Sequence, residues 1–384
     1  MHRRRLSTFH PGPHRFATPR VAVFLVFGIL LTACEDRGGT VERQLGDYLV
    51  QVRYAAGAAG LELPASPPTA PSWPRQRDIR LDLPDTRMGF LDFFALQDCA
   101  LHRIIAERNN AMGRVMTPSQ RLVYEQRFIA AARECRALLL GTGETGLANR
   151  VDSVLRIKEE TLSRVFWNAT FGGPEFAALF SGAAQPLPWR DNAGSIDREL
   201  TALTLLATLQ ESLADGRMAV EAHRVEAAFE LLDESRFGGA LVRSLDLITH
   251  HLNAAADVVE LRLDQGPLCG EEGRSPDAEA LIRAFYRGYG GGVQPYLARV
   301  HRLGREWLAL VDRLVSGQDS AVAPAFRSWY RERLDPHHPE SAWNRFQEAV
   351  ARHTATWGRL LEQCDALPGM SGTPGGNAPQ KPQP

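Results

Sequence analysis

From residue 89 onward, apolar residues recur at steps of three or four, which is the spacing of one face of an α-helix. The clearest regular run lies between about Gly239 and Leu263, and no convincing alternation typical of strands follows residue 88. The pattern therefore predicts a mainly α fold, a helical bundle-like array. Helices with this spacing are predicted near 147–168, 195–214, 217–235, 239–263, 276–287, 293–316, 322–333 and 340–365.

Two packed helices are predicted at the start of this region. An apolar face runs from Phe90 to Ile105. The stretch Thr117–Gln120 then begins a second helix, with Thr at the N-cap, Pro at N1 and Gln at N3. Apolar residues follow on one face from Tyr124 to Leu139, so we predict an antiparallel hairpin.

The part of the chain before residue 89 has two different patterns. Val41–Ala59 shows a helical stripe, whereas Leu63–Pro84 carries six prolines, which exclude a helix or a central strand and predict an extended segment. Its expected points of attachment to the body are apolar, with the last three alternating as in an edge strand: Trp73, Ile79, Leu81 and Leu83.

The stretch Val21–Cys34 has the pattern of a bacterial lipoprotein signal. Five arginines and no acid precede an apolar run of about thirteen residues, too short to span a bilayer. The run ends in Leu-Thr-Ala-Cys, which resembles a lipobox, so we predict cleavage before Cys34 and acylation of this cysteine with chains such as palmitate. The predicted divisions are a signal peptide (1–33), a lipidated tether (34–40), a helix with the Pro-rich segment (41–88), an α-helical domain made of one body or of two fused subdomains (89–367), and a disordered tail (368–384).

Charge and cysteine content narrow the class of protein further. Removing the five leader arginines changes the formal net charge from −1 to −6, which gives no indication of nucleic-acid binding. Besides Cys34 the chain has four cysteines, an even number that fits an oxidising compartment. Of the three possible pairings we favour Cys99–Cys135 and Cys269–Cys364, because each pair would join neighbouring helical segments.

The sequence contains short stretches that resemble cofactor- or metal-binding motifs, but the surrounding secondary structure does not fit such sites. Gly141–Gly146 matches G-x-G-x-x-G but follows a helix rather than a strand, so we interpret it as a linker. Gly288–Gly292 is interpreted as a helix break. His337-His338 is the best metal candidate, although a solvated turn fits these residues better. We therefore predict no cofactor and no metal site.

Polar residues at the connection of the predicted hairpin form a first candidate binding site: Glu107, Arg108, Asn109, Arg121 and Glu125. The residues before and after the connection would face each other. They form either an interhelical network of ion pairs and caps, or a polar pocket for a ligand or partner.

The stretch Trp167–Phe176 forms a second candidate site, with these residues of interest: Trp167, Asn168, Phe171, Glu175 and Phe176. Three aromatics, a glycine pair and a carboxylate within ten residues form either a recognition loop or a buried turn. A recognition loop would leave Phe171 and Glu175 partly exposed and close to Arg121.

These motifs together resemble an uncharacterised family of Gram-negative envelope lipoproteins, a domain-of-unknown-function family. The resemblance rests on GFLDFF, ERNNAMGR, SQRLVYEQRF and WNATFGGPEF, with a cysteine after the first and third. It implies an envelope lipoprotein with a helical body and supplies no catalytic residue, cofactor or substrate.

We therefore expect a non-enzymatic lipoprotein held in a membrane by its lipid anchor, facing the periplasm from the outer membrane, that binds another envelope protein or a glycan. The alternative is a periplasmic hydrolase or glycan-acting enzyme that uses paired carboxylates among Glu107, Glu125 and Glu175. A carboxylate pair in an open cleft would favour the enzyme, and burial against arginines would favour the binding protein.

Overall fold

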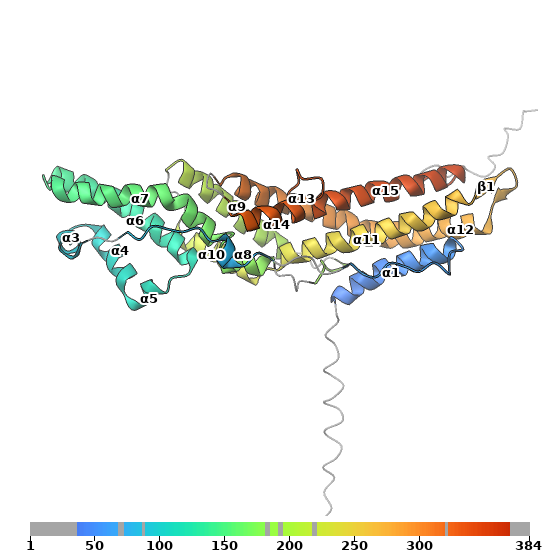
Figure 1. The fold of residues 1–384 in the computed structure, drawn as a ribbon, viewed down its shortest axis with the longest axis horizontal. Helices are drawn as coiled ribbons and strands as arrows, with labels where there is room; N and C mark the ends of the chain where they lie inside the picture. The colour runs from blue at the N-terminus through green and yellow to red at the C-terminus, as the bar shows by residue number, and fades with distance from the viewer. Residues whose placement is uncertain are drawn as a thin grey trace, which may run out of the picture. The chain divides into compact units, whose positions relative to one another are not determined.

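Amphipathic helices form nearly all of the regular structure, so the predicted mainly α class is confirmed. The computed structural model describes residues 37–67, 73–86, 89–180, 185–190, 195–216, 221–318 and 322–368. The predicted signal peptide, the lipidation site Cys34 and the tail from residue 369 onward lie outside these residues. Figure 1 shows the arrangement of the helices.

The first helix, α1 (Arg37–Ala55), buries the predicted stripe with Leu45 and Tyr48 against α11 (Phe237–Asp264) and against a π-helix, η1 (Ala284–Val293). It begins at Arg37, so its first four residues fall within the predicted tether, residues 34–40.

An extended segment, residues 73–86, here called the strap, follows. It contains a short helix, α2 (Gln76–Ile79), although the prolines of this segment predicted that it would contain none. The helix fits because it lies between Pro74 and Pro84 and contains no proline itself. The predicted edge strand over Ile79–Leu83 is wrong. The described residues form a single strand pair, β1 (Cys269–Gly270) with β2 (Gly273–Arg274).

Three short helices make up the arm, residues 89–116: α3 (Phe90–Ala95), α4 (Ala100–Asn109) and α5 (Ala111–Arg114). The apolar face predicted from Phe90 to Ile105 is split by a turn between Ala95 and Ala100. In α4, Leu101 and Ile104 are buried, whereas Phe90 and Leu91 of α3 are 74% and 81% exposed.

The arm packs on a long helical hairpin of α6 (Pro118–Gly141) and α7 (Thr145–Ala169). Thr117 and Gln120 form the predicted capping box, in which each side chain bonds to the other residue's backbone N–H. The disulfide Cys99–Cys135 links the start of α4 to α6, as predicted. The predicted linker Gly141–Gly146 contains the turn between α6 and α7, residues 142–144, with Gly143 at a φ of +82°.

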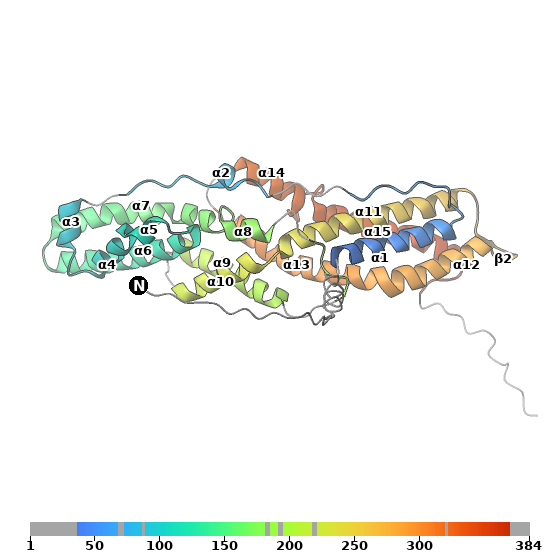
Figure 2. The ribbon, with the colours of Figure 1, turned by 90° about the horizontal axis from the view of Figure 1, so that it is seen from below.

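The remaining helices continue the array. They are α8 (Pro174–Leu179), α9 (Ser195–Ala214), α10 (Ala222–Glu234), α11, α12 (Pro276–Arg283), η1, α13 (Gln294–Ser316), α14 (Pro324–Arg333) and α15 (Ala342–Gln363). Helices α11 and α15 lie side by side with α1 along them (Figures 1 and 2). The second predicted disulfide, Cys269–Cys364, joins β1 to the residue after α15.

The prediction of a helix break at Gly288–Gly292 is wrong. These glycines lie inside η1, which continues from α12 into α13 without interruption. A Cβ at Gly288 would lie 3.1 Å from Cδ2 of Tyr48, so the missing side chain lets α1 approach η1 closely. Pro295, at the start of α13, has no N–H to donate to the preceding turn.

Candidate functional site

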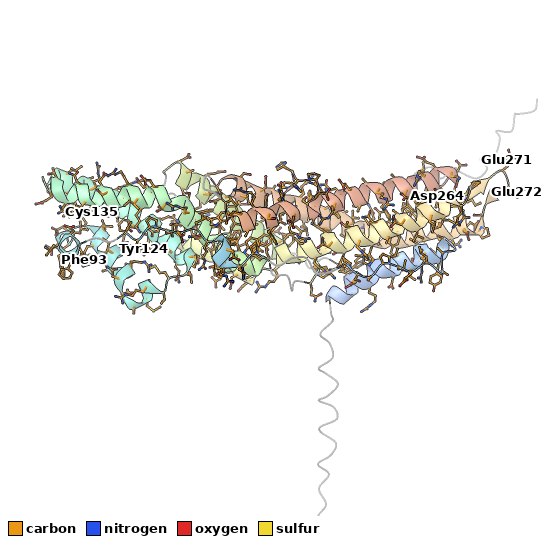
Figure 3. The ribbon with its side chains drawn as sticks, viewed as in Figure 1. Phe93, Tyr124, Cys135, Asp264, Glu271 and Glu272 are labelled. Atoms are coloured by element: carbon orange, nitrogen blue, oxygen red, sulfur yellow. A yellow bond between two sulfur atoms is a disulfide. The ribbon has the colours of Figure 1, made fainter. Side chains whose placement is uncertain are left out.

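A pocket of about 490 Å³ lies between the arm, the strap and the α6–α7 hairpin. This volume falls within the range typical of small-molecule sites. Figure 3 labels Phe93 and Tyr124, which the arm and the hairpin contribute to the lining. The pocket is lined by Leu83, Pro84, Asp85 and Thr86 of the strap, by Phe93, Ile105, Arg108 and Asn109 of the arm, and by Arg121, Tyr124, Glu125, Phe128, Val154 and Lys158 of the hairpin.

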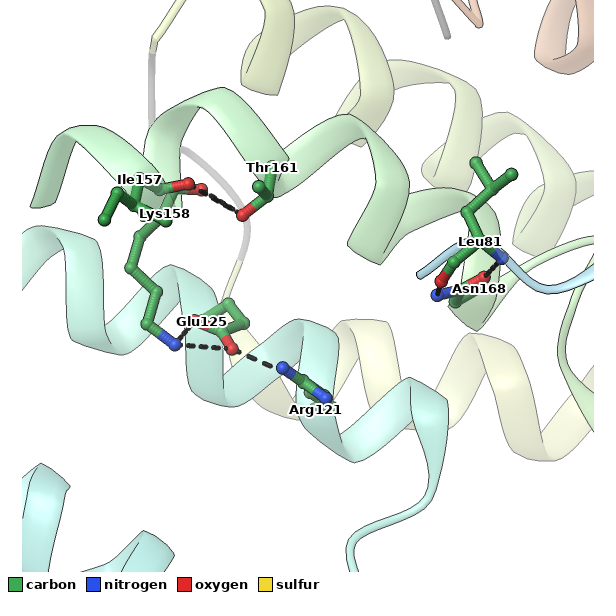
Figure 4. Close-up of polar contacts among 7 residues, drawn as sticks. All are labelled: Leu81, Arg121, Glu125, Ile157, Lys158, Thr161 and Asn168. Carbon is green, nitrogen blue, oxygen red and sulfur yellow. Dashed lines mark hydrogen bonds and ion pairs between the residues drawn. The ribbon is translucent and has the colours of Figure 1, made fainter. Parts of the chain in front are cut away.

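A buried ion-paired group forms the polar wall of this pocket (Figure 4). Lys158 Nζ lies 2.9 Å from Glu125 Oε1 and 2.7 Å from Glu125 Oε2. Arg121, one helical turn before Glu125 in α6, places its Nε 3.4 Å from Glu125 Oε1. The side chains of Glu125 and Lys158 are 3% and 10% exposed, so the pair is removed from bulk solvent.

Two aromatic rings of α6 complete the surroundings of the lysine. Lys158 Nζ lies 5.7 Å from the ring centroid of Tyr124 and 5.1 Å from that of Phe128. Burial, followed by the charge of Glu125, raises the pKa of the Tyr124 hydroxyl well above its usual value, although Arg108 and Arg121 oppose this shift. Tyr124 therefore presents a neutral hydroxyl that can donate a hydrogen bond.

The five polar residues of the first predicted site, which lie on α4 and α6, separate into two groups. Arg108, Asn109, Arg121 and Glu125 line the pocket. Glu107 instead pairs with Arg127 at 2.9 Å on the surface. Both interpretations drawn from the sequence, the ion-pair network and the pocket, therefore describe part of the structure.

Arg108 differs from the other two cations of the pocket. Its Nη1 atom is buried and donates to no hydrogen-bond partner in the structure. Lys158 and Arg121 are both engaged by Glu125, whereas Arg108 Nη1 is a buried donor without an acceptor among the described residues.

A family model covers the whole of this region. It is described as a protein of unknown function, DUF3080, and it matches residues 58–368, which include every residue of the pocket and both disulfides. The chain belongs to the DUF3080 family. No curated protein and no solved structure matches the chain.

The second candidate site of this DUF3080 chain, Trp167–Phe176, is a buried turn. Phe171 and Phe176 have no exposed surface, and Glu175 is 9% exposed and accepts a hydrogen bond from Ser119 Oγ at 2.7 Å. The expectation that Phe171 and Glu175 lie on the surface is therefore wrong. None of the five candidate residues in this turn lines the pocket.

The turn has a different task, because Trp167 and Asn168 hold the strap. Trp167 Nε1 donates to the Ile79 carbonyl at 2.7 Å. The Asn168 amide accepts from the Leu81 N–H at 2.8 Å and donates to the Leu81 carbonyl at 2.7 Å (Figure 4). Side chains of α7 thus satisfy backbone groups that a neighbouring strand would otherwise satisfy.

Sequence reasoning missed several residues of the pocket: Phe93, Tyr124, Lys158 and the strap residues 83–86. Lys158 carried a signal, because it falls between Leu155 and Leu162 on the apolar stripe of α7. It is also one of only two lysines in the chain. A charged residue on a buried stripe predicts a paired partner, which the structure supplies in Glu125.

The part of the chain that the structure describes holds no group of three or more His, Cys, Asp or Glu side chains arranged to bind a metal ion. Of its helices, none is both long enough and apolar enough to cross a membrane.

Proposed function

We propose that this DUF3080 protein is a lipid-anchored binding protein that faces the periplasm and holds another envelope component in the pocket between the arm and the α6–α7 hairpin. The observation that carries the proposal is the pocket itself, a cavity of ligand size whose walls combine a buried ion-paired group with aromatic surface.

The proposed anchor is supported by the leader sequence and by the position of α1. Only Glu35 and Asp36 separate Cys34 from the first helical residue, Arg37. The proposed lipid on Cys34 would therefore be joined to the helical body by a short stretch of sequence. The two disulfides suit an oxidising compartment such as the periplasm.

Binding is favoured over hydrolysis by the partners of the three candidate carboxylates. A paired-carboxylate mechanism requires two carboxyl groups that face one cleft. Glu125 is engaged by Lys158 and Arg121, Glu107 by Arg127, and Glu175 by Ser119. Of the three, Glu125 alone lines the pocket; Asp85 also lines it, but Glu125 is already engaged by Lys158 and Arg121.

Two experiments test the two halves of this proposal. In native cells, C34S should leave the membrane fraction and keep its leader uncleaved; unchanged fractionation and processing would refute the anchor. A photo-crosslinking residue at Asn109, on the rim of the pocket, should capture a discrete envelope component. The same residue at the exposed Asn149 of α7 is the matched control, and equal patterns from both positions would refute a pocket-bound partner.

A further inference from the structure

The pocket of the proposed function also indicates what it recognises. Resting on that proposed function, we infer that the pocket binds the anionic group of a small organic ligand or ligand moiety, a carboxylate, phosphate or sulfonate carried on an apolar or ring-bearing body, and that Arg108 holds this group.

The charges of the lining residues favour an anion. Among the described residues that line the pocket, the cations Arg108, Arg121 and Lys158 outnumber the carboxylates Asp85 and Glu125 by one positive charge. Glu125 accepts from both Lys158 and Arg121. The excess positive charge would repel a cationic ligand, whereas an anionic ligand would neutralise it.

Arg108 provides the specific contact. A buried guanidinium N–H without an acceptor has lost its hydration and gained nothing in return. Its Nη1 is such a group. A carboxylate or phosphate oxygen placed beside it would satisfy this donor with a charge-assisted hydrogen bond, the geometry for which guanidinium is well suited.

Tyr124 supports the same assignment from the opposite helix. Tyr124 of α6 and Arg108 of α4 line the same pocket. Because the phenol stays neutral, it can donate a second hydrogen bond to an anion held by Arg108.

The apolar walls define the rest of the ligand. Phe93 lines the pocket and is held by stacking on His102 with ring centroids 4.3 Å apart. Ile105, Phe128 and Val154 add further apolar surface. A bare inorganic ion would leave these walls hydrated, so an anion attached to a flat or apolar body fits the pocket better.

A pair of probes that differ only in charge tests this assignment. Naphthalene-2-sulfonate carries one negative charge, and naphthalene-2-sulfonamide is its neutral counterpart of similar shape. Calorimetric titration of the full chain, with detergent blanks subtracted, should show at least tenfold tighter binding of the sulfonate. Equal affinity for the two probes, or binding of neither, would overturn the inference.

Two arginine variants of α4 locate the site. R108Q should weaken sulfonate binding at least tenfold and leave sulfonamide binding unchanged, whereas R108K should recover part of the preference. The control is R103Q, since the side chain of Arg103 is 77% exposed on the same helix. If R108Q and R103Q bind the sulfonate equally, Arg108 is not the anion-holding residue. If R108Q fails to fold, the test uses the affinities of R108K and of the unmodified chain for the sulfonate and the sulfonamide.

Competition separates this inference from the proposed function and identifies the source of the anion. Sulfonate that blocks capture at residue 109 shows that the captured envelope component carries the anionic group. Sulfonate that binds through Arg108 without affecting capture points to a separate free anion and still supports the inference. Capture without any charge preference between the probes would support the proposed function and refute the inference.

Discussion

The two hydrogen bonds between Asn168 and Leu81 should contribute measurably to stability, because they hold the strap to α7 from a single side chain. N168A removes both bonds, 2.8 and 2.7 Å long, and leaves a backbone N–H and a backbone carbonyl without their protein partner. Each bond is worth about 0.5–1.5 kcal/mol net. We expect the free energy of unfolding to fall by about 1–3 kcal/mol in total, as measured by urea denaturation of the full chain.

Limited trypsin digestion measures the same effect locally. The side chains of Arg75 and Arg77 in the strap are 68% and 72% exposed, so cleavage there depends on release of the backbone. A loss of about 1–3 kcal/mol in local stability should raise the cleavage rate about five- to 150-fold. The matched control is N149A, which removes an exposed asparagine of the same helix.

The aspartate variant distinguishes hydrogen bonding from side-chain volume. N168D keeps the size of the side chain and an acceptor for the Leu81 N–H, but places a carboxylate oxygen against the Leu81 carbonyl. It should therefore be at least as unstable as N168A. A loss below 0.5 kcal/mol in both variants, with unchanged cleavage, would refute the assignment of the strap to Asn168.

Two further predictions concern buried carboxyl groups. Burial raises the pKa of Glu199, which accepts from Trp307 Nε1, to about 7 from 4.5. The unfolded chain therefore loses this proton at lower pH than the folded chain, so the free energy of unfolding should fall by about 3 kcal/mol between about pH 4.5 and 7. In urea denaturation at a series of pH values, E199Q should remove most of this fall. An unchanged slope in the variant would contradict the raised pKa of Glu199. E175A should lower the free energy of unfolding by about 1–3 kcal/mol, because it removes the acceptor of the buried Ser119 hydroxyl. The control is E230A, at an exposed position of α10, which should change the free energy of unfolding by less than about 0.5 kcal/mol. Equal effects of the two variants would contradict the structural role of Glu175.

Features with local causes could be predicted from the sequence. The start of α6 depends on Thr117 and Gln120, three residues apart, and the capping box formed as predicted. The disulfide pairing could be predicted because each pair joins helical segments that the sequence pattern predicts to be neighbours.

Features that depend on distant segments were missed. Gly288 is typical of a helix break when viewed alone, but it lies inside a continuous helix, and a Cβ there would lie 3.0 Å from Gln51 Oε1 and 3.1 Å from Tyr48 Cδ2 of the distant helix α1. The pocket shows the same limit. Its arginines and Glu125 were predicted because they flank one short connection in the sequence. Phe93, Lys158 and the strap belong to other elements, and no local pattern indicates that these elements come together.

The turn at Trp167 and the polar pocket were two separate candidate sites in the sequence, and the strap connects them. Ile79 and Leu81 of the strap are fixed by Trp167 and Asn168. Two residues later the same segment becomes a wall of the pocket, from Leu83 to Thr86. Asn168 therefore positions a ligand-facing wall without touching the cavity, in the way that supporting residues hold binding groups in place. Because the proposed anion contact belongs to Arg108 on another element, release of the strap should weaken the naphthalenesulfonate and the sulfonamide alike. Loss of Arg108 should weaken the sulfonate alone, so the two probes separate the shape of the pocket from its charge.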